Sequence, residues 1–248
     1  MNEPQPVLIV GATSAIARAT AAEFARRGHA LFLTARDAAE LGRIAADLRL
    51  RYGQPVETEA FDLADTEGHA SLLQRVEASV GPLYGVVLAS GSLGNAERTR
   101  EDEGEAARLL HINFTAPALL LNRIARELES RAEGFIVGIG SVAGDRGRQS
   151  NYVYGSAKGG LALYLQGLRN RLNSCGVQVL TVKPGFVDTA MTYGLPGLFL
   201  VASPQSVGRN IATAVDKKRD TLYTPWFWRW IMLIIRSIPE RVFKRLSL

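Results

Sequence analysis

Cysteine is almost absent from this sequence: Cys175 is the one cysteine among 248 residues. A single thiol cannot close a disulfide within the chain, so the fold does not call for an oxidising compartment. Residues 1–6 also lack the basic start and apolar run of a secretory signal. Both features favour the cytoplasm as the place where the protein works.

Histidine is scarce as well, and the three histidines lie far apart. His29, His69 and His111 are separated by 40 and 42 residues. Neither cysteine nor a second histidine stands at the short spacings that metal sites use. We therefore predict no metal site.

Excess positive charge is lacking over most of the chain. Residues 217–248 hold eight basic and two acidic residues, and the rest of the chain is nearly neutral, so the net charge of +5 belongs to the C-terminal end. A nucleic-acid-binding protein spreads its basic residues over a folded face. Nucleic acid is therefore not expected as a partner.

What the sequence does contain is the alternation of an α/β domain. Apolar residues make up 47% and charged residues 21%, as in ordinary globular proteins, and this length suits one large domain. Short apolar runs alternate with stretches whose apolar residues recur every three or four positions. The expected strands are 7–10, 30–34, 56–61, 83–89, 135–139 and 177–182, and the expected helices are 15–27, 38–51, 66–80, 105–131 and 152–173.

This alternation predicts a Rossmann-type α/β fold, a doubly wound parallel sheet flanked by helices on both faces. Gly28, Gly53, Gly81 and Gly176 stand where helices should end before the next strand. A ligand is expected beyond the carboxyl ends of the strands, where the strand order reverses. We assign residues 1–224 to this domain.

A turn of small residues follows the first expected strand. Gly11, Thr13 and Ser14 lead into a helix that starts with Ala15 and Ile16. Such a turn lets the backbone approach a pyrophosphate at a helix N-terminus, although a tight turn in any α/β protein has the same pattern. Alanines at positions 15 and 17 replace two glycines of the usual fingerprint.

The second expected strand is followed by Arg36. An acidic residue there normally binds the adenosine ribose, whereas an arginine suits the 2′-phosphate of NADP(H). Asp37, one residue later, fits the cap of the next helix in an Asp-Ala-Ala-Glu box. Arg36 thus favours NADP(H), and a solvated surface arginine is the alternative.

The pair Tyr154 and Lys158 is the clearest candidate for chemistry. Four residues apart on an expected helix, the two side chains share one face, and the ammonium is expected to lower the pKa of the phenol toward the working range of a general acid. Ser141, at the end of the fifth expected strand, can donate to the same carbonyl oxygen. This set would polarise a C=O for hydride attack, whereas a Tyr-x-x-x-Lys pair alone also arises by chance.

Together these motifs resemble the short-chain dehydrogenase/reductase family over residues 6 to about 224. The gap of 13 residues from Ser141 to Tyr154 is typical of that family. The chain departs from it after the fourth strand, where the usual Asn-Asn-Ala-Gly is replaced. The other matches, in the family's order, are Asp62 with Leu63, then Ala89-Ser90-Gly91, then Asn113, and the segment from Lys183 to Thr189.

The resemblance implies a role for each matched residue. Tyr154 would be the acid/base, and Lys158 would lower its pKa and hold the nicotinamide ribose. Ser141 would orient the carbonyl, Asn113 would carry a water in a proton relay through Lys158, and Asp62 would bind the adenine. The implied NADP(H)-binding residues are Gly11, Thr13, Ser14, Ala15, Ile16, Arg36, Asp62, Leu63, Ala89, Gly91, Tyr154, Lys158, Pro184, Gly185, Val187 and Thr189.

A narrower resemblance concerns the substrate. The turn after the first strand and residues 145–156 are similar to reductases of decaprenylphosphoryl-2-keto-pentose. This implies a keto-sugar on a polyprenyl phosphate, with Arg146 and Arg148 near the phosphate unless both are solvated loop charges. The largely apolar residues 190–202, with Gly194 and Gly197 as hinges, occupy the place of a substrate lid.

The C-terminal tail, residues 225–248, has the pattern of an amphipathic helix that restarts at Pro239. Its densest apolar run has ten residues and is broken by Arg229, whereas a spanning helix needs about 20. Three tryptophans beside basic residues favour a peripheral position at the inner face of the membrane. Packing on the body or on a second subunit is the alternative. The apolar face is expected to hold Ile231, Ile235, Ile238 and Val242.

We therefore expect an NADPH-dependent carbonyl reductase that acts near the membrane surface on a small-molecule or lipid-linked ketone. A homo-oligomer, a dimer or a tetramer, is expected. A soluble dehydrogenase of a small ketone, steroid or sugar is the alternative among enzymes. A non-catalytic NADP-binding regulator is the alternative from another class, and the complete set of Asn113, Ser141, Tyr154 and Lys158 argues against it.

Overall fold

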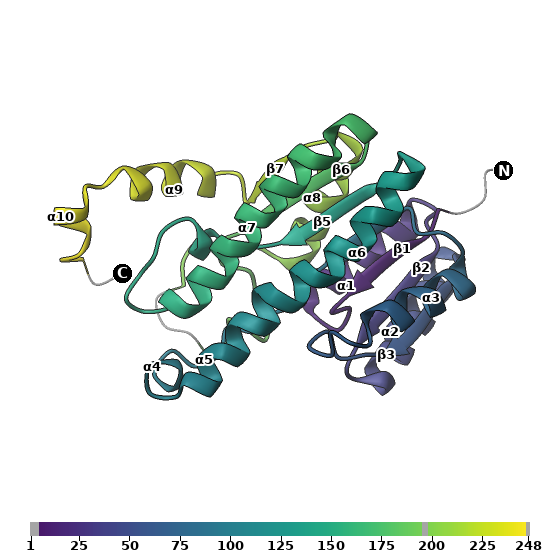
Figure 1. Cartoon of the computed structure of the whole chain (residues 1–248), viewed down its shortest axis with the longest axis horizontal. Coiled ribbons are helices and arrows are strands. Elements are labelled where there is room, and N and C mark those ends of the chain that lie inside the picture. Colours follow the sequence, from purple (N-terminus) through teal and green to yellow (C-terminus); the bar gives the residue numbers. More distant parts are fainter. Residues whose placement is uncertain (1–4, 195–197, 247–248) are drawn as a thin grey trace.

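The computed structural model describes residues 5–194 and 198–246. Seven parallel strands form one sheet in the order β3-β2-β1-β4-β5-β6-β7 (Figure 1). The predicted doubly wound parallel sheet is therefore confirmed. The strands are β1 (Val7–Val10), β2 (Leu31–Ala35), β3 (Val56–Ala60), β4 (Gly85–Leu88), β5 (Phe135–Ile139), β6 (Gln178–Pro184) and β7 (Thr221–Thr224).

Helices cover both faces of the sheet. One face carries α1, α2 and α8, and the other carries α3, α6 and α7 (Figure 1). The helices are α1 (Ala15–Arg26), α2 (Ala38–Tyr52), α3 (His69–Val80), α4 (Arg98–Glu101), α5 (Glu103–Leu110), α6 (Ala116–Arg131), α7 (Tyr152–Leu172), α8 (Pro204–Asp216), α9 (Trp228–Ser237) and α10 (Glu240–Phe243).

The core is divided between these two faces by the alternation of side chains along each strand. In β1, Val7 and Ile9 pack toward α1 and α2, and Leu8 and Val10 pack toward α3 and α6. All four side chains are buried, as expected of a strand covered on both sides.

The strand order reverses next to β1, which pairs with β2 on one side and with β4 on the other. Val10, the last residue of β1, stands in register with Thr34 of β2 and Leu88 of β4. The chain therefore leaves β1 and β4 in opposite directions across the sheet, and this opens a crevice at their carboxyl ends.

One predicted helix is wrong in its extent, and helices α4 and α8 and strand β7 were not predicted. The expected helix 105–131 is divided into α5, a π-helical turn (His111–Thr115) and α6. The apolar spacing did not predict α8, although Ser203 caps it and Pro204 opens it, a common start signal. The short strand β7 was missed because its four residues were too few to stand out as an apolar run.

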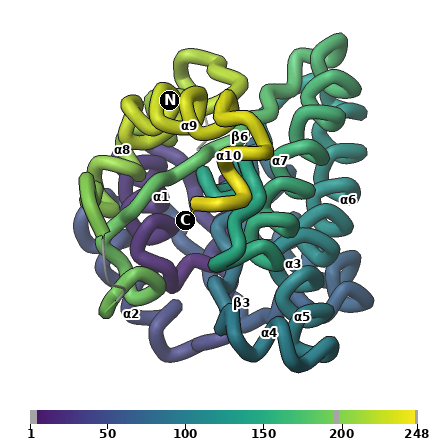
Figure 2. Tube along the Cα trace, turned by 90° about the vertical axis from the view of Figure 1, so that its left-hand side faces the viewer, coloured from purple at the N-terminus to yellow at the C-terminus, as the bar shows by residue number. Residues whose placement is uncertain are grey.

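The chain ends in α9 and α10, which project from the body of the molecule (Figure 1). Figure 2 looks onto that end of the molecule, with the two helices in yellow. The break predicted at Pro239 is confirmed, since Ile238 and Pro239 separate the helices. Across the described residues, no helix combines the length and apolar character needed to cross a bilayer.

Candidate active site

Two cavities meet at the carboxyl ends of the strands, and we call them together the strand-end groove. One has a volume of about 370 Å³ and holds Tyr154 and Lys158, and the other has about 330 Å³ and holds Arg36 and Asp62. They share the turn after β1 and the segment after β4. The shared lining residues are Thr13, Ser14, Ala89, Ser90 and Gly91.

The turn after β1 keeps the expected geometry despite its missing glycines. Gly11 has a φ of +80°, and an added Cβ would lie 2.7 Å from the backbone nitrogen of Ser90. Glycine is therefore required where the two loops touch. Ser14 caps α1 by accepting a hydrogen bond from the Ala17 backbone N–H at 3.2 Å. Ala17 is fully buried, so its methyl group packs inside the fold and leaves the groove free.

Arg36 lies exposed at the far end of the groove, directly after β2. The next residue, Asp37, caps α2 by accepting from the Glu40 backbone N–H at 2.9 Å, as predicted. Glu40 does not complete the capping box, because its carboxylate pairs with Arg18 and Arg43. At the same end, Asp62 accepts a hydrogen bond from Ala64 N–H at 3.0 Å.

Tyr154, Lys158 and Ser141 line one cavity, with the first two on α7 and Ser141 just after β5. Lys158 is buried, donates to the Ile139 carbonyl at 3.2 Å and lies with its Nζ 5.9 Å from the centroid of the Tyr154 ring. Ser141 Oγ accepts from Ala143 N–H at 3.1 Å, which fixes the hydroxyl at the end of the strand. The structure thus brings the predicted trio together.

Burial controls the ionisation of Tyr154 and Lys158. It raises the pKa of Tyr154 to about 12, an effect opposed by the nearby Ser141 hydroxyl. It lowers the pKa of Lys158 to about 8. The expected lowering of the Tyr154 pKa is wrong for this structure, because loss of water around the phenol outweighs the distant ammonium.

Asn113 lies in the π-helical turn between α5 and α6 and is fully buried. Its amide Nδ2 donates to the carbonyls of Ser92 at 2.8 Å and Leu109 at 2.9 Å, and its Oδ1 accepts from Ser92 N–H at 3.2 Å. The side chain therefore anchors the loop after β4 to the helix. Gly91 allows this approach, because an added Cβ would lie 2.8 Å from Asn113 Oδ1. Turns of this π-helical kind are frequent at functional sites.

Every residue predicted from sequence to bind the cofactor lines the strand-end groove. Asn113 does not line it and lies beneath Gly91. The sequence reasoning missed several other lining residues, because they carry no motif of their own. These include Arg18, Arg108 and Ile112. Ala190, Met191 and Thr192 also line the groove and belong to the segment predicted as a substrate lid.

A further cavity of about 580 Å³, which we call the side cavity, lies on the other side of Tyr154. Tyr154 lines both the side cavity and the strand-end groove. Phe186, from the loop after β6, and Arg148 also line the side cavity. Tyr154 therefore forms part of the wall of both spaces.

The C-terminal tail packs against the body through one face of α9. Trp228 and Met232 are buried, and Trp228 contacts the rings of Phe186 and Phe199. Ile231, from the predicted apolar face, packs against the cluster of Trp228 and Met232, so this part of the prediction is correct. Val242, from the same predicted face, is exposed. Phe199, from the predicted lid segment 190–202, belongs to this aromatic contact. The predicted hinge Gly197 lies outside the described residues.

Arg146 does not face a phosphate site, and that expectation is wrong. Its Nη1 donates to the carbonyls of Ile235 at 2.8 Å and Ile238 at 2.6 Å, and its Nη2 pairs with Glu240 at 2.9 Å. The guanidinium also lies 3.8 Å from the centroid of the Phe243 ring. Arg146 thus fastens the end of α9 and the start of α10, because free carbonyls at a helix C-terminus attract a cation.

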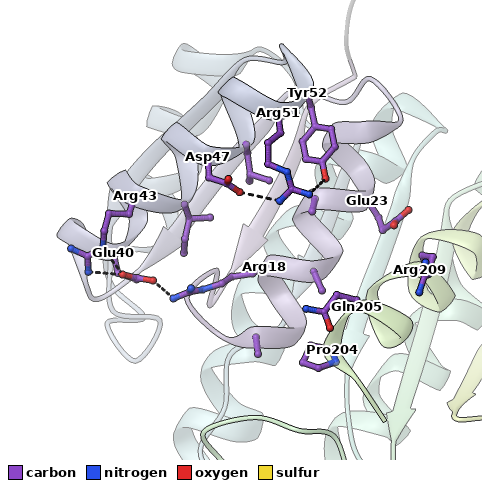
Figure 3. Close-up of a pocket in the computed structure, with 15 residues that line it drawn as sticks. Arg18, Glu23, Glu40, Arg43, Asp47, Arg51, Tyr52, Pro204, Gln205 and Arg209 are labelled. Carbon is purple, nitrogen blue, oxygen red and sulfur yellow. Dashed lines mark hydrogen bonds and ion pairs between the residues drawn. The ribbon is translucent and has the colours of Figure 1, made fainter.

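A separate groove of about 790 Å³ runs between α1, α2 and the start of α8 (Figure 3). Its charged side chains largely pair with one another: Arg18 and Arg43 bind Glu40, and Arg51 binds Asp47. It holds none of the candidate catalytic side chains. We therefore take the strand-end groove as the candidate active site.

Comparison with known proteins agrees with this geometry. The family model described as short chain dehydrogenase matches residues 5–196. An uncharacterized oxidoreductase of Mycobacterium tuberculosis is 36% identical over 244 residues, which cover 97% of this chain and 96% of the relative.

Two solved structures have the same fold over nearly the whole chain. A short-chain dehydrogenase from Sphingobium yanoikuyae, in complex with NADPH, has a TM-score of 0.82 and 27% identity, covering 95% of this chain and 97% of its own. The bulky-bulky ketone specific alcohol dehydrogenase from Comamonas testosteroni has a TM-score of 0.80 and 25% identity, covering 96% of both chains.

Proposed function

The chain belongs to the short-chain dehydrogenase family, and from this premise we propose that it is an NADPH-dependent carbonyl reductase. One observation carries the proposal. Tyr154, Lys158 and Ser141 line one cavity at the carboxyl ends of the strands. A proton donor, a cation and a second hydroxyl at one point match the needs of a carbonyl oxygen that gains charge during reduction.

The groove fits NADP(H). Ser90 Oγ is buried without a hydrogen-bond partner at the junction of the two cavities, so a bound polar group would satisfy it. The N-terminus of α1 faces the groove through Ser14 and Ala15, where a pyrophosphate is favoured. Arg36 lies exposed at the far end, and in this proposal its guanidinium binds the 2′-phosphate. The NADPH complex of the Sphingobium dehydrogenase supports the same choice.

We assign Pro184, Gly185, Val187 and Thr189 to the nicotinamide end of the groove and Asp62 to the adenine end. When bound, NADPH supplies the hydride for the reaction. The chain's own residues then control the oxygen and the proton.

In the proposed mechanism, the Ser141 hydroxyl donates a hydrogen bond to the substrate carbonyl oxygen and holds it near Tyr154. The Tyr154 phenol gives its proton to that oxygen as the alcohol forms. Its raised pKa keeps the proton in place at neutral pH until transfer. The buried ammonium of Lys158 stabilises the phenolate that remains. Asn113, which fixes the loop beside Lys158, would support the return of a proton from solvent.

The test is a screen of the purified protein with NADPH against lipid-linked, steroid, sugar and small soluble ketones. Reduction of any ketone by the wild type, with a loss of several orders of magnitude in Tyr154→Phe, supports the proposal, because the variant keeps the ring and loses the proton. NADPH binding should be nearly unchanged in that variant. A Tyr154→Phe enzyme that keeps most of its turnover would contradict the assignment of Tyr154 as the proton donor. A wild-type protein that binds NADPH without reducing any ketone would favour the alternative of a non-catalytic NADP-binding regulator.

We further propose that the enzyme works at the surface of an anionic membrane on a lipid-linked ketone such as a keto-sugar. The outer face of the tail supports this, since Trp226, Trp230 and Ile234 are 72%, 55% and 67% exposed. Exposed basic residues Arg229 and Arg236 stand among them. Aromatic and apolar groups beside cations suit the boundary between headgroups and acyl chains. A soluble ketone remains the alternative substrate.

A homo-oligomer, a dimer or a tetramer, is also part of this proposal. Leu119 on α6 and Leu163 on α7 are large apolar side chains exposed on neighbouring helices of one face. Exposed apolar residues of this kind favour contact with a second copy of the chain.

A further inference from the structure

The side cavity has the position of a substrate pocket, given the function proposed above. Tyr154 forms part of its wall and also faces the strand-end groove. A ketone whose oxygen meets the phenol therefore has the side cavity as room for the rest of the molecule. Its volume of about 580 Å³ is enough for a ligand much larger than a simple ketone.

One charged side chain of this cavity, Arg148, is incompletely paired. Its Nε is buried and has no hydrogen-bond partner. Its Nη2 lies 3.7 Å from the sulfur of Met232, a weak acceptor. Among the described residues, no carboxylate lies within 4.0 Å of it. Arg148 is partly buried. An N–H group that has lost water without gaining a hydrogen-bond partner is costly, and an anionic ligand would offset that cost.

The nearest acidic residue in the sequence, Asp145, already has partners other than Arg148. Asp145 is almost fully buried and pairs with Lys183, and it also accepts a hydrogen bond from the Tyr223 hydroxyl at 2.7 Å. Arg146, two residues before Arg148, is held by the tail. Arg100, at the rim of the side cavity, already donates to the Gln149 carbonyl at 2.7 Å. Burial lowers the pKa of Arg148, and the negative charge of Asp145 opposes this effect only in part.

A second polar side chain of the side cavity is also unsatisfied. Asn151 stands at the N-cap of α7 but makes no capping hydrogen bond with its side chain. Its Oδ1 is buried and has no partner. An unpaired acceptor calls for a donor, and a ligand hydroxyl would provide one.

We propose that Arg148 is the anion-binding residue of the side cavity, and that the physiological substrate is a hydroxylated ketone carrying a phosphoryl or carboxylate group. The guanidinium donates to the anion, and Asn151 Oδ1 accepts from a neighbouring hydroxyl. Charge-assisted hydrogen bonds to a planar guanidinium are strong and directional, so Arg148 selects anionic over neutral ketones. This proposal rests on the function proposed above, because it takes the side cavity as the substrate pocket.

The test uses inorganic phosphate and acetate as probes of the two anion chemistries. Each is titrated into the protein saturated with NADP⁺, so that the anion sites of the cofactor are filled, and binding is followed by the thermal unfolding midpoint at constant ionic strength. Inhibition of the reduction of a neutral ketone by each anion is the second readout. The variants are Arg148→Gln and Arg148→Lys, and the matched control is Arg126→Gln, which removes an exposed arginine of α6 that does not line the cavity.

Wild type and Arg126→Gln should bind one or both anions, and Arg148→Gln should bind them roughly tenfold to a hundredfold more weakly. Arg148→Lys keeps the positive charge but lacks the planar guanidinium, so its anion affinity should lie between those of the wild type and Arg148→Gln. Binding of phosphate alone identifies a phosphoryl group, and binding of acetate alone identifies a carboxylate. Equal affinity in the wild type and both Arg148 variants, or no anion binding by the wild type, overturns the proposal. The thermal unfolding measurement requires no turnover. A protein that binds anions at Arg148 but reduces no ketone would therefore contradict the proposed carbonyl reductase activity and leave the anion site standing.

Discussion

The indole of Trp228 packs directly on Gly185, so closely that an added Cβ would overlap the ring. Gly185 belongs to the segment after β6 that lines the strand-end groove, and Trp228 is the first residue of α9. One contact thus joins the candidate active site to the C-terminal tail.

Gly185→Ala should displace the tail. Overpacking of a buried contact costs about 1–3 kcal/mol, so the free energy of unfolding should fall by about that amount in chemical denaturation. The tryptophan emission should shift to the red, because Trp228 is buried whereas Trp226 and Trp230 are already exposed. Gly167→Ala is the matched control: its helical position has open space, and it should gain about 0.5–1 kcal/mol. Wild-type stability in Gly185→Ala would show that α9 moves aside without cost.

Arg36→Asp should change the preference between cofactors. Loss of a charge-assisted contact to the 2′-phosphate, with a repelling carboxylate in its place, should raise the KM for NADPH roughly tenfold to a hundredfold. The KM for NADH should change far less. Steady-state kinetics with both cofactors give the comparison, with Arg126→Asp as the control for net charge. Equal effects on NADPH and NADH would mean that Arg36 is a solvated surface arginine.

The reduction rate should fall on the alkaline side. Lys158 has a pKa of about 8, so it is cationic below that pH and loses its charge as the pH rises through it. Tyr154, with a pKa of about 12, keeps its proton over the same range. The kcat for ketone reduction, measured from roughly pH 6 to 10, should therefore decline above about pH 8. A profile that stays flat to pH 10 would show that the charge of Lys158 is not needed.

The outer face of the tail should bind anionic vesicles. Trp230→Ser combined with Ile234→Ser removes exposed apolar area while leaving the buried Trp228 and Met232 in place. The wild type should sediment with vesicles of anionic lipid, less so at high salt because salt screens the basic residues. The double variant should bind several-fold more weakly.

Leu50→Ser is the control for that experiment, since Leu50 is an exposed apolar residue of α2. If the wild type ignores vesicles and the double variant instead dissociates into smaller species on gel filtration, the outer face is a subunit contact. Truncation after Thr224 is a poor test, because it also removes Trp228 and Met232 from the packed body.

Much of the site could be predicted from the sequence because its residues sit at positions that local patterns define. Gly11 and Ser14 follow a strand and open a helix, and Tyr154 and Lys158 share a helical face. In a parallel sheet the strand ends meet at one edge. Residues far apart in the chain, such as Arg36 and Ser141, therefore reach one groove without any long-range information in their own motifs.

Ionisation could not be predicted in the same way. The spacing of Tyr154 and Lys158 predicts proximity, but the extent of burial depends on the strands and helices packed around them. The Tyr154 pKa is raised rather than lowered, because loss of water outweighs the distant ammonium.

The sequence by itself determined the alternation of strands and helices, the order of the motifs and the break in the tail at Pro239, since each depends on local propensity and periodicity. Only the tertiary structure decided what Arg146 and Arg148 do. The two arginines stand two residues apart in one loop, yet Arg146 binds the carbonyls of α9 and Arg148 lies in the side cavity with an unpartnered Nε. The local sequence does not distinguish the roles of the two arginines. The partner of each guanidinium comes from a segment more than 80 residues away or, in our proposal, from a ligand.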